Sequence, residues 1–179
     1  MDTKKIVVIE NKPSPKPKII NPKERRKRVI TQKSKWNEIV ESIHDENEYM
    51  TNLLSSTPET TPMYEMALMQ IKGKIRGYLS QDKEKKLYCE EKFVNFEHIL
   101  SLFRDSSMNC YYCKEKTILF YEYVREPKQW TLERIDNNFG HNCDNVVIAC
   151  LGCNLRRRTM ASEKYVQTKA MSKVVKLDS

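Results

Sequence analysis

Two Cys-x-x-Cys pairs constrain the fold of this chain more than any other feature. They are Cys110-Tyr-Tyr-Cys113 and Cys150-Leu-Gly-Cys153, and 36 residues lie between them. Two thiolate pairs on tight turns suit the tetrahedral preference of a structural Zn²⁺, whose bonds to sulfur are roughly 2.3 Å long. One such pair would be typical of a redox motif, but two seldom are. The spacing therefore predicts one zinc ion that closes a folded insert.

The other two cysteines, Cys89 and Cys143, stand outside this pattern. Four thiolates already complete the site, so we interpret both as small buried or surface thiols. No stretch approaches the roughly 18 apolar residues that span a bilayer, and the N-terminal apolar run is too short for a signal peptide. We expect an intracellular protein, nuclear or cytoplasmic, with no membrane partner. That reducing setting favours metal-bound cysteines over disulfides.

Residues 1–35 form a basic segment. They hold twelve Lys and Arg against three acidic residues, and four of the seven prolines, whereas the remainder of the chain is close to neutral. Few large apolar residues are available to offset the entropy of ordering, so a disordered arm is expected. The run Arg25-Arg26-Lys27-Arg28 is compatible with nuclear targeting or with binding a polyanion. A solvated tail is the alternative interpretation.

Three amphipathic patterns predict helices over residues 36–54, 62–79 and 95–105, the last with Asn95 as N-cap. Gly73 and Gly77 weaken the second pattern. Beyond residue 107, KTILFYEYV and WTLERI predict two strands, residues 145–149 a third extended piece, and residues 154–169 a terminal helix. The expected fold is α+β, divided into a disordered basic arm (1–35), a helical region (36–106), a zinc-stapled domain (107–170) and a tail (171–179).

The insert contains the string WTLERIDNNFGHNCDNVVIACLGCN. Its ERID…GHN…DNVV…C-x2-CN arrangement resembles the HNH endonucleases of the treble-clef type found in DNA viruses and phages. The resemblance covers residue 109 to about 165 and extends more weakly upstream. It implies a ββα-metal module held by structural zinc, and a metal-dependent endonuclease that hydrolyses phosphodiester bonds in DNA.

The resemblance also implies roles for particular residues. The family's acid on the first strand, which binds a catalytic Mg²⁺ or Mn²⁺, falls on Glu133, and the histidine that follows it in the family falls on Arg134. The asparagine that braces the loop matches Asn145. The residue directly after the second cysteine pair matches Asn154, and a basic residue three positions later matches Arg157.

Elementary chemistry is consistent with this placing. A carboxylate on a strand and an amide oxygen at a helix start can share one Mg²⁺, which keeps water and substrate phosphate as its other ligands. Three consecutive arginines, Arg156, Arg157 and Arg158, could bind phosphates through bidentate contacts. A solvated charge run is the alternative for these three.

Arg134 departs from the family pattern. An arginine stays protonated at any useful pH, so it cannot serve as general base, although it could stabilise the transition state. A metal-bound hydroxide, His141 or Asp136 would then accept the proton, and His141 ranks first as the histidine of this region. His141 could equally be a histidine that only hydrogen-bonds the loop, and Asp136 could cap the turn at Asn137 and Asn138.

The leading expectation is thus an HNH-type DNA endonuclease with zinc as structural metal and Mg²⁺ or Mn²⁺ as catalytic metal. A catalytically inactive, zinc-stapled module that binds nucleic acid is the first alternative. A packaging or interaction protein, in which the basic arm condenses nucleic acid, is the second. Cleavage of both DNA strands by one active site would require a homodimer.

Overall fold

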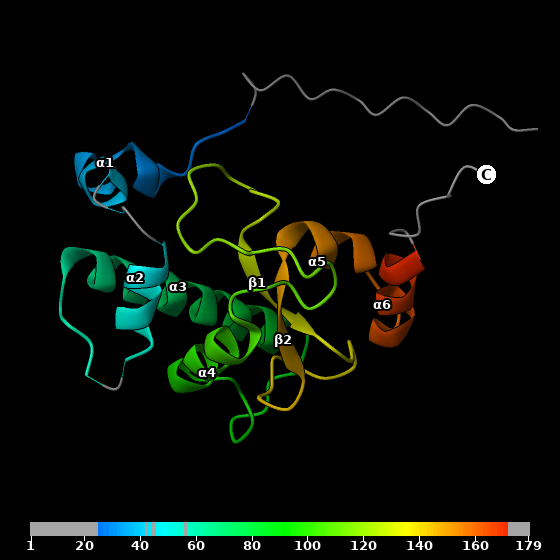
Figure 1. Ribbon diagram of the computed structural model, residues 1–179. Helices are drawn as coiled ribbons and strands as arrows, with labels where there is room; N and C mark the ends of the chain where they lie inside the picture. The colour runs from blue at the N-terminus through cyan, green and yellow to red at the C-terminus, as the bar shows by residue number, and fades with distance from the viewer. Residues whose placement is uncertain (1–24, 42, 44–45, 56, 172–179) are drawn as a thin grey trace, which may run out of the picture.

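The structure is a computed structural model that describes residues 25–41, 43, 46–55 and 57–171. Within these ranges it contains six α-helices and a two-stranded sheet (Figure 1). None of the helices in the described ranges is both long and apolar enough to cross a membrane. The elements in chain order are α1 (Ser34–Glu41), α2 (Glu46–Leu53), α3 (Pro62–Glu84), α4 (Phe96–Ser106), β1 (Trp130–Arg134), β2 (Val146–Cys150), α5 (Leu151–Arg157) and α6 (Ser162–Met171).

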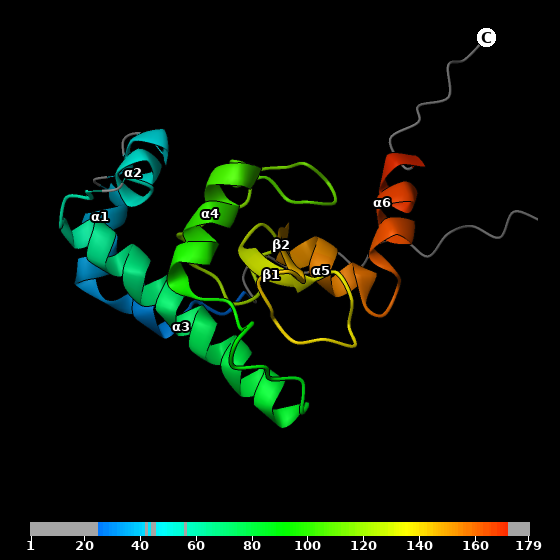
Figure 2. The same cartoon turned by 90° about the horizontal axis from the view of Figure 1, so that it is seen from below.

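The antiparallel pair β1–β2 lies between two sets of helices. Figure 2 shows α3 and α4 on one side of the hairpin and α5 and α6 on the other. In the register, Leu132 is opposite Ile148 and Glu133 is opposite Val147. Because side chains alternate along a strand, successive residues of β1 face different helices. The mixed α+β fold predicted from the sequence is confirmed.

The first face of the hairpin joins the main core. Trp130 and Leu132 are fully buried with residues of α3 and α4, and the rings of Trp130 and Phe103 meet edge to face with centroids 4.9 Å apart. Burying side chains of this size supplies most of the favourable free energy of a small domain. The hairpin is therefore anchored on α4.

Helices α3 and α4 begin and end at residues that satisfy their free backbone groups. Thr61 caps α3 by accepting a hydrogen bond from the backbone N–H of Tyr64 at 3.1 Å. Asn95 accepts from His98 N–H at 2.8 Å, as the sequence predicted, and α4 ends at Ser107 in the left-handed region (φ 48°). Helix α3 runs unbroken through its two glycines, because burial of one face outweighs their low helix propensity.

Two sequence predictions about secondary structure are wrong. Residues 116–124 form no strand and make only isolated bridges, such as Ile118 with Gln129. Their apolar side chains serve packing instead: Leu119 is fully buried, and the ring of Phe120 meets that of Trp36. The terminal helix is divided into α5 and α6, because Arg158 has a positive φ of 53°.

The prediction of a disordered arm over residues 1–35 is wrong for its last part, residues 25–35. Residues 1–24 lie outside the described residues, but the chain from Arg25 on packs against the loop that follows residue 120. Arg25 pairs with Glu126 and Lys27 with Glu122, and the Arg28 guanidinium stacks 3.9 Å from the centroid of the Tyr121 ring. The basic run is therefore not a solvated tail. Glu122 and Glu126 neutralise part of its charge.

Candidate functional site

The four cysteines of the two pairs come together in space. The sulfur atoms of Cys110, Cys113, Cys150 and Cys153 all lie within 4.8 Å of one another. A tetrahedron with metal–sulfur bonds of about 2.3 Å has edges of about 3.8 Å, and the sulfurs of Cys113 and Cys150 lie 3.9 Å apart. The cluster could therefore hold a zinc ion, as the spacing predicted.

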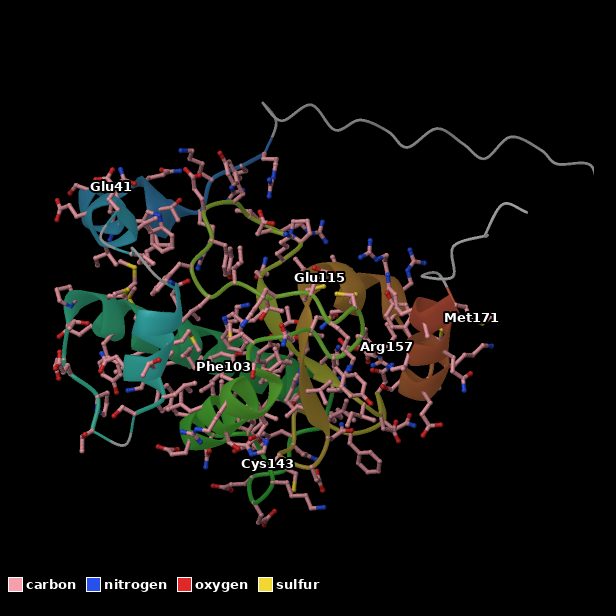
Figure 3. The ribbon with its side chains drawn as sticks, in the orientation of Figure 1. Glu41, Phe103, Glu115, Cys143, Arg157 and Met171 are labelled. Carbon is pink, nitrogen blue, oxygen red and sulfur yellow. The ribbon has the colours of Figure 1, made fainter. Side chains whose placement is uncertain are left out.

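Backbone hydrogen bonds shape both cysteine turns. In the first turn, Lys114 N–H donates to Cys110 C=O at 2.9 Å, and Lys114 adopts a positive φ of 62°. Tyr111 N–H donates to Ile148 C=O at 2.8 Å, which joins this turn to β2. In the second, Cys150 ends β2 and caps α5, since its sulfur accepts from Cys153 N–H at 3.4 Å. Glu115, labelled in Figure 3, marks the first turn beside the start of α5.

Within the sulfur cluster, Cys110 is the cysteine whose pKa is lowered. Hydrogen bonding to the Cys150 thiol lowers the pKa of Cys110 to about 4 and raises the pKa of Cys150. The thiolate is the form that a metal binds. The outlying thiols Cys89 and Cys143 are half-buried and exposed, respectively, and do not belong to the cluster.

The second face of the hairpin carries polar side chains toward α5. Asn154 Nδ2 donates to Thr131 Oγ1 at 3.3 Å, and two residues further along β1 the Glu133 carboxylate accepts from Arg157 Nε. Residues two positions apart on β1 therefore contact residues three positions apart on α5. The strand acid and the helix asparagine that the resemblance singled out therefore both lie between β1 and α5.

Arg157 is buried, in contrast to the phosphate contact expected for it. Its exposed fraction is 2 %. Besides pairing with Glu133, its guanidinium donates to Met160 C=O at 2.6 Å, Arg134 C=O at 2.5 Å and Asn137 Oδ1 at 3.0 Å. Every side of the guanidinium is thus engaged by protein acceptors, so the residue joins α5 to β1. Figure 3 shows Arg157 between the hairpin and α6.

Burial controls the ionisation of Glu133. It raises the pKa of the carboxyl above its usual range, while the hydrogen bond from Arg157 acts in the opposite direction. The side chain is 6 % exposed, and the carboxylate requires a cationic partner at that depth. Arg157 fills this role in the structure, and a divalent cation would satisfy the same requirement.

The loop between β1 and β2 is held by Asn145 and Arg134. The Asn145 side chain accepts from Asp136 N–H at 2.9 Å and donates to the carbonyls of Asp136 and Gly140 at 2.9 and 3.0 Å. Arg134 Nη1 donates to the carbonyls of Asn137 and Phe139. Asp136 is exposed, and its Oδ1 accepts from Asn138 N–H at 2.9 Å, which is the turn-capping contact considered for it.

His141 forms a buried pair with Asp82 of α3. Its ring Nδ1 lies 2.8 Å from Asp82 Oδ1, and its backbone N–H donates to Oδ2 at 2.6 Å. The ring also packs on Tyr78, with centroids 4.4 Å apart. Asp82 was not identified from the sequence, because nothing local distinguishes one acid of a polar helix end that lies 59 residues away from its partner.

A cavity of about 560 Å³ opens beside this polar face. Arg157 and Asp136 line it from one side, and residues 159–163, which include the start of α6, line it from the other. Arg156 and Arg158 are exposed on the same helix end. The charged residues that line the cavity are two acids, Asp136 and Glu163, and the buried Arg157.

Comparison of the chain with protein-family models, with curated proteins and with solved structures gave no significant match. The interpretation of the site therefore depends on its own geometry.

Proposed function

We propose that this chain is a metal-dependent endonuclease of the HNH type that hydrolyses phosphodiester bonds in DNA. One observation carries the proposal. Glu133 of β1 and Asn154 of α5, the residues that the family resemblance assigns to a catalytic cation, enter the same space between strand and helix. The four-cysteine cluster lies at the start of α5, directly before Asn154, and would fix that spacing with a zinc ion.

The two side chains offer suitable ligand atoms. The side-chain Nδ2 of Asn154 donates a hydrogen bond to Thr131, so the amide oxygen of Asn154 would be the atom that binds a cation. The Glu133 carboxylate would exchange Arg157 for Mg²⁺ or Mn²⁺, hard ions that prefer oxygen ligands. Arg157 would keep its place in this exchange, because three further acceptors hold it. The bound cation would supply Lewis-acid activation of water and of the scissile phosphate.

Among the side chains, the geometry favours Asp136 over His141 as proton acceptor. The ring of His141 is buried and its Nδ1 is engaged by Asp82, whereas Asp136 is exposed at the cavity. A metal-bound hydroxide would serve as well. Arg134, whose guanidinium holds loop carbonyls, would shape the loop rather than bind the phosphate, and the exposed Arg158 would face the DNA backbone.

The test is nicking of supercoiled plasmid with Mg²⁺ or Mn²⁺. Glu133→Gln keeps an acceptor for Arg157 but removes the charge that a cation needs, so activity is expected to fall at least about 100-fold. Asn154→Ala is expected to behave similarly. Glu163→Gln, which neutralises an exposed acid on the opposite wall of the cavity, is the matched control and should retain activity. Equal activity in all four proteins would refute the proposal.

A second function is favoured by the Glu133–Arg157 pair itself. A carboxylate already neutralised by a buried arginine suits a zinc-stapled module that binds nucleic acid without cutting it. Such a module should retard DNA on a gel equally with and without Mg²⁺ and produce no nicks. Retardation without nicking, unchanged in Glu133→Gln, would select this alternative.

A further inference from the structure

Helix α6 packs directly on the cysteine cluster. Tyr165 of α6 is buried against Tyr112, which lies between the two cysteines of the first pair, with ring centroids 4.8 Å apart and nearly perpendicular. The Tyr112 hydroxyl lies 3.3 Å from Ser162 Oγ at the start of α6. The two rings and the cysteines form a small core of their own. The position of α6 is therefore tied to the sulfur atoms.

The hydroxyl of Tyr165 is buried and meets no hydrogen-bond partner among the described residues. Tyr165 belongs to the same small core as Cys153, so its ring brings this hydroxyl to the cysteine cluster. A buried hydroxyl without an acceptor destabilises the folded state. A metal-bound thiolate at Cys153 would supply the missing acceptor.

Arg156 of α5 lies beside the second cysteine pair. Its guanidinium folds back over Gly152, where a β-carbon would lie only 3.2 Å from Nη2. Gly152 directly precedes Cys153 in the chain, so this guanidinium lies next to the second cysteine pair. Four thiolates around one divalent ion leave two negative charges in excess, so a cation beside one sulfur stabilises the filled site.

We propose that Tyr165 and Arg156 are outer-shell groups of the metal centre, both donating to the sulfur of Cys153, and that α6 is held in place by the bound metal. This goes beyond the nuclease proposal and stands even if the chain cuts no DNA. Since the segment leading into α6 forms one wall of the 560 Å³ cavity, the metal would also set the width of that cavity.

The test measures metal affinity in the full chain. Zn²⁺ affinity is measured by competition with a chelator, and Co²⁺ substitution reports sulfur ligation through its charge-transfer absorption. Tyr165→Phe removes one hydroxyl and keeps the ring, and is expected to weaken Zn²⁺ binding about 10-fold. Tyr112→Phe is the matched control: it removes the neighbouring hydroxyl, which contacts Ser162 instead of a sulfur, and should change affinity less than twofold.

Two further measurements separate an outer-shell role from simple packing. Arg156→Lys should retain most of the affinity and Arg156→Gln should lose it, because the cationic donor is what matters. Amide hydrogen exchange across α6 should accelerate when the metal is removed. Equal affinities for wild type and Tyr165→Phe, equal losses in both tyrosine variants, unchanged exchange in α6, or no metal uptake by the wild type would each overturn the proposal.

Discussion

The carboxylate of Asp82 accepts two hydrogen bonds from His141, one from the ring Nδ1 side and one from the backbone N–H, at 2.8 and 2.6 Å. Asp82 is completely buried at the end of α3, whereas His141 lies in the loop between β1 and β2. Through this contact the helical region fixes the loop that also carries Asp136 and Asn145. The helices thus contribute to the site by placing its loop.

Asp82→Ala is expected to destabilise the protein by about 3 kcal/mol, because two buried donors of His141 lose their acceptor. The free energy of unfolding, measured with denaturant, checks this. Asp144→Ala is the matched control. Its carboxylate pairs with Lys92, but both side chains are more than half exposed, so little change is expected. Similar losses for both variants would contradict the role given to Asp82.

Protonation of His141 should destabilise the folded protein as the pH is lowered. Burial lowers the pKa of His141 from its usual 6.5, with Asp82 opposing, and Arg134, Lys85 and the Tyr78 ring also face it. The unfolded chain therefore takes up the proton first, so this stability is present above about pH 6.5 and is lost as the pH falls below it. Thermal unfolding from pH 8 to 5 should show a steeper loss for wild type than for His141→Gln, and parallel curves would contradict this.

Breaking the Glu133–Arg157 pair from either side should be costly. Glu133→Ala leaves a buried cation and is expected to cost about 3 kcal/mol, and Arg157→Ala should cost more, since three other acceptors lose their donor. Because the two residues contact each other, the double variant should be less destabilised than the sum of the single ones. Denaturant unfolding of the wild type, the two single variants and the double variant completes a double-mutant cycle. Strictly additive losses in the free energy of unfolding would contradict the pairing.

Substituting one cluster cysteine should remove the metal and unfold the C-terminal module. Cys110→Ser is expected to lose one equivalent of zinc, because structural zinc contributes folding free energy directly. Cys143→Ser, which changes an exposed thiol outside the cluster, should retain metal and fold. Metal content by mass spectrometry and circular dichroism provide the readouts. Zinc retained in Cys110→Ser would contradict the four-sulfur site.

Gly140 is expected to tolerate no side chain. A β-carbon there would lie 2.5 Å from Leu87 C=O and 2.7 Å from Asp82 Oδ2, so Gly140→Ala must move backbone and should cost about 2 kcal/mol or more. Gly77→Ala provides the contrast. Nothing lies within 4 Å of its added carbon in the middle of α3, and stability should rise by up to about 1 kcal/mol. Thermal melts of the two variants should therefore shift in opposite directions.

The features predicted correctly from sequence are those encoded locally. The Cys-x-x-Cys spacing, the alternation in WTLERI and the Asn95 cap each depend on residues a few positions apart, and the structure contains a four-sulfur cluster, β1 and the cap of α4 accordingly. Local patterns also suggested a strand at residues 116–124. Strand formation requires a partner, however, and these residues found buried packing sites instead.

The contacts that the sequence did not reveal are long-range. Three consecutive arginines look alike in sequence, and only the helical phase of α5 relative to β1 turns Arg157 inward to Glu133 and leaves its neighbours exposed. The Asp82–His141 pair likewise depends on the docking of α3 against the loop. Neither arrangement follows from the composition of a short window.

The cysteine pairs lie at opposite ends of a 36-residue insert, and the turn near Asn138 is exposed between its two strands. A protease that cut there would leave two pieces, each with two of the four sulfurs and one strand of the hairpin. Neither fragment could complete a tetrahedral site alone. With a zinc ion bound, the two fragments would therefore remain in one complex until a chelator removed the ion. The same division gives a natural place to split the chain into two fragments that reassemble only when zinc is added.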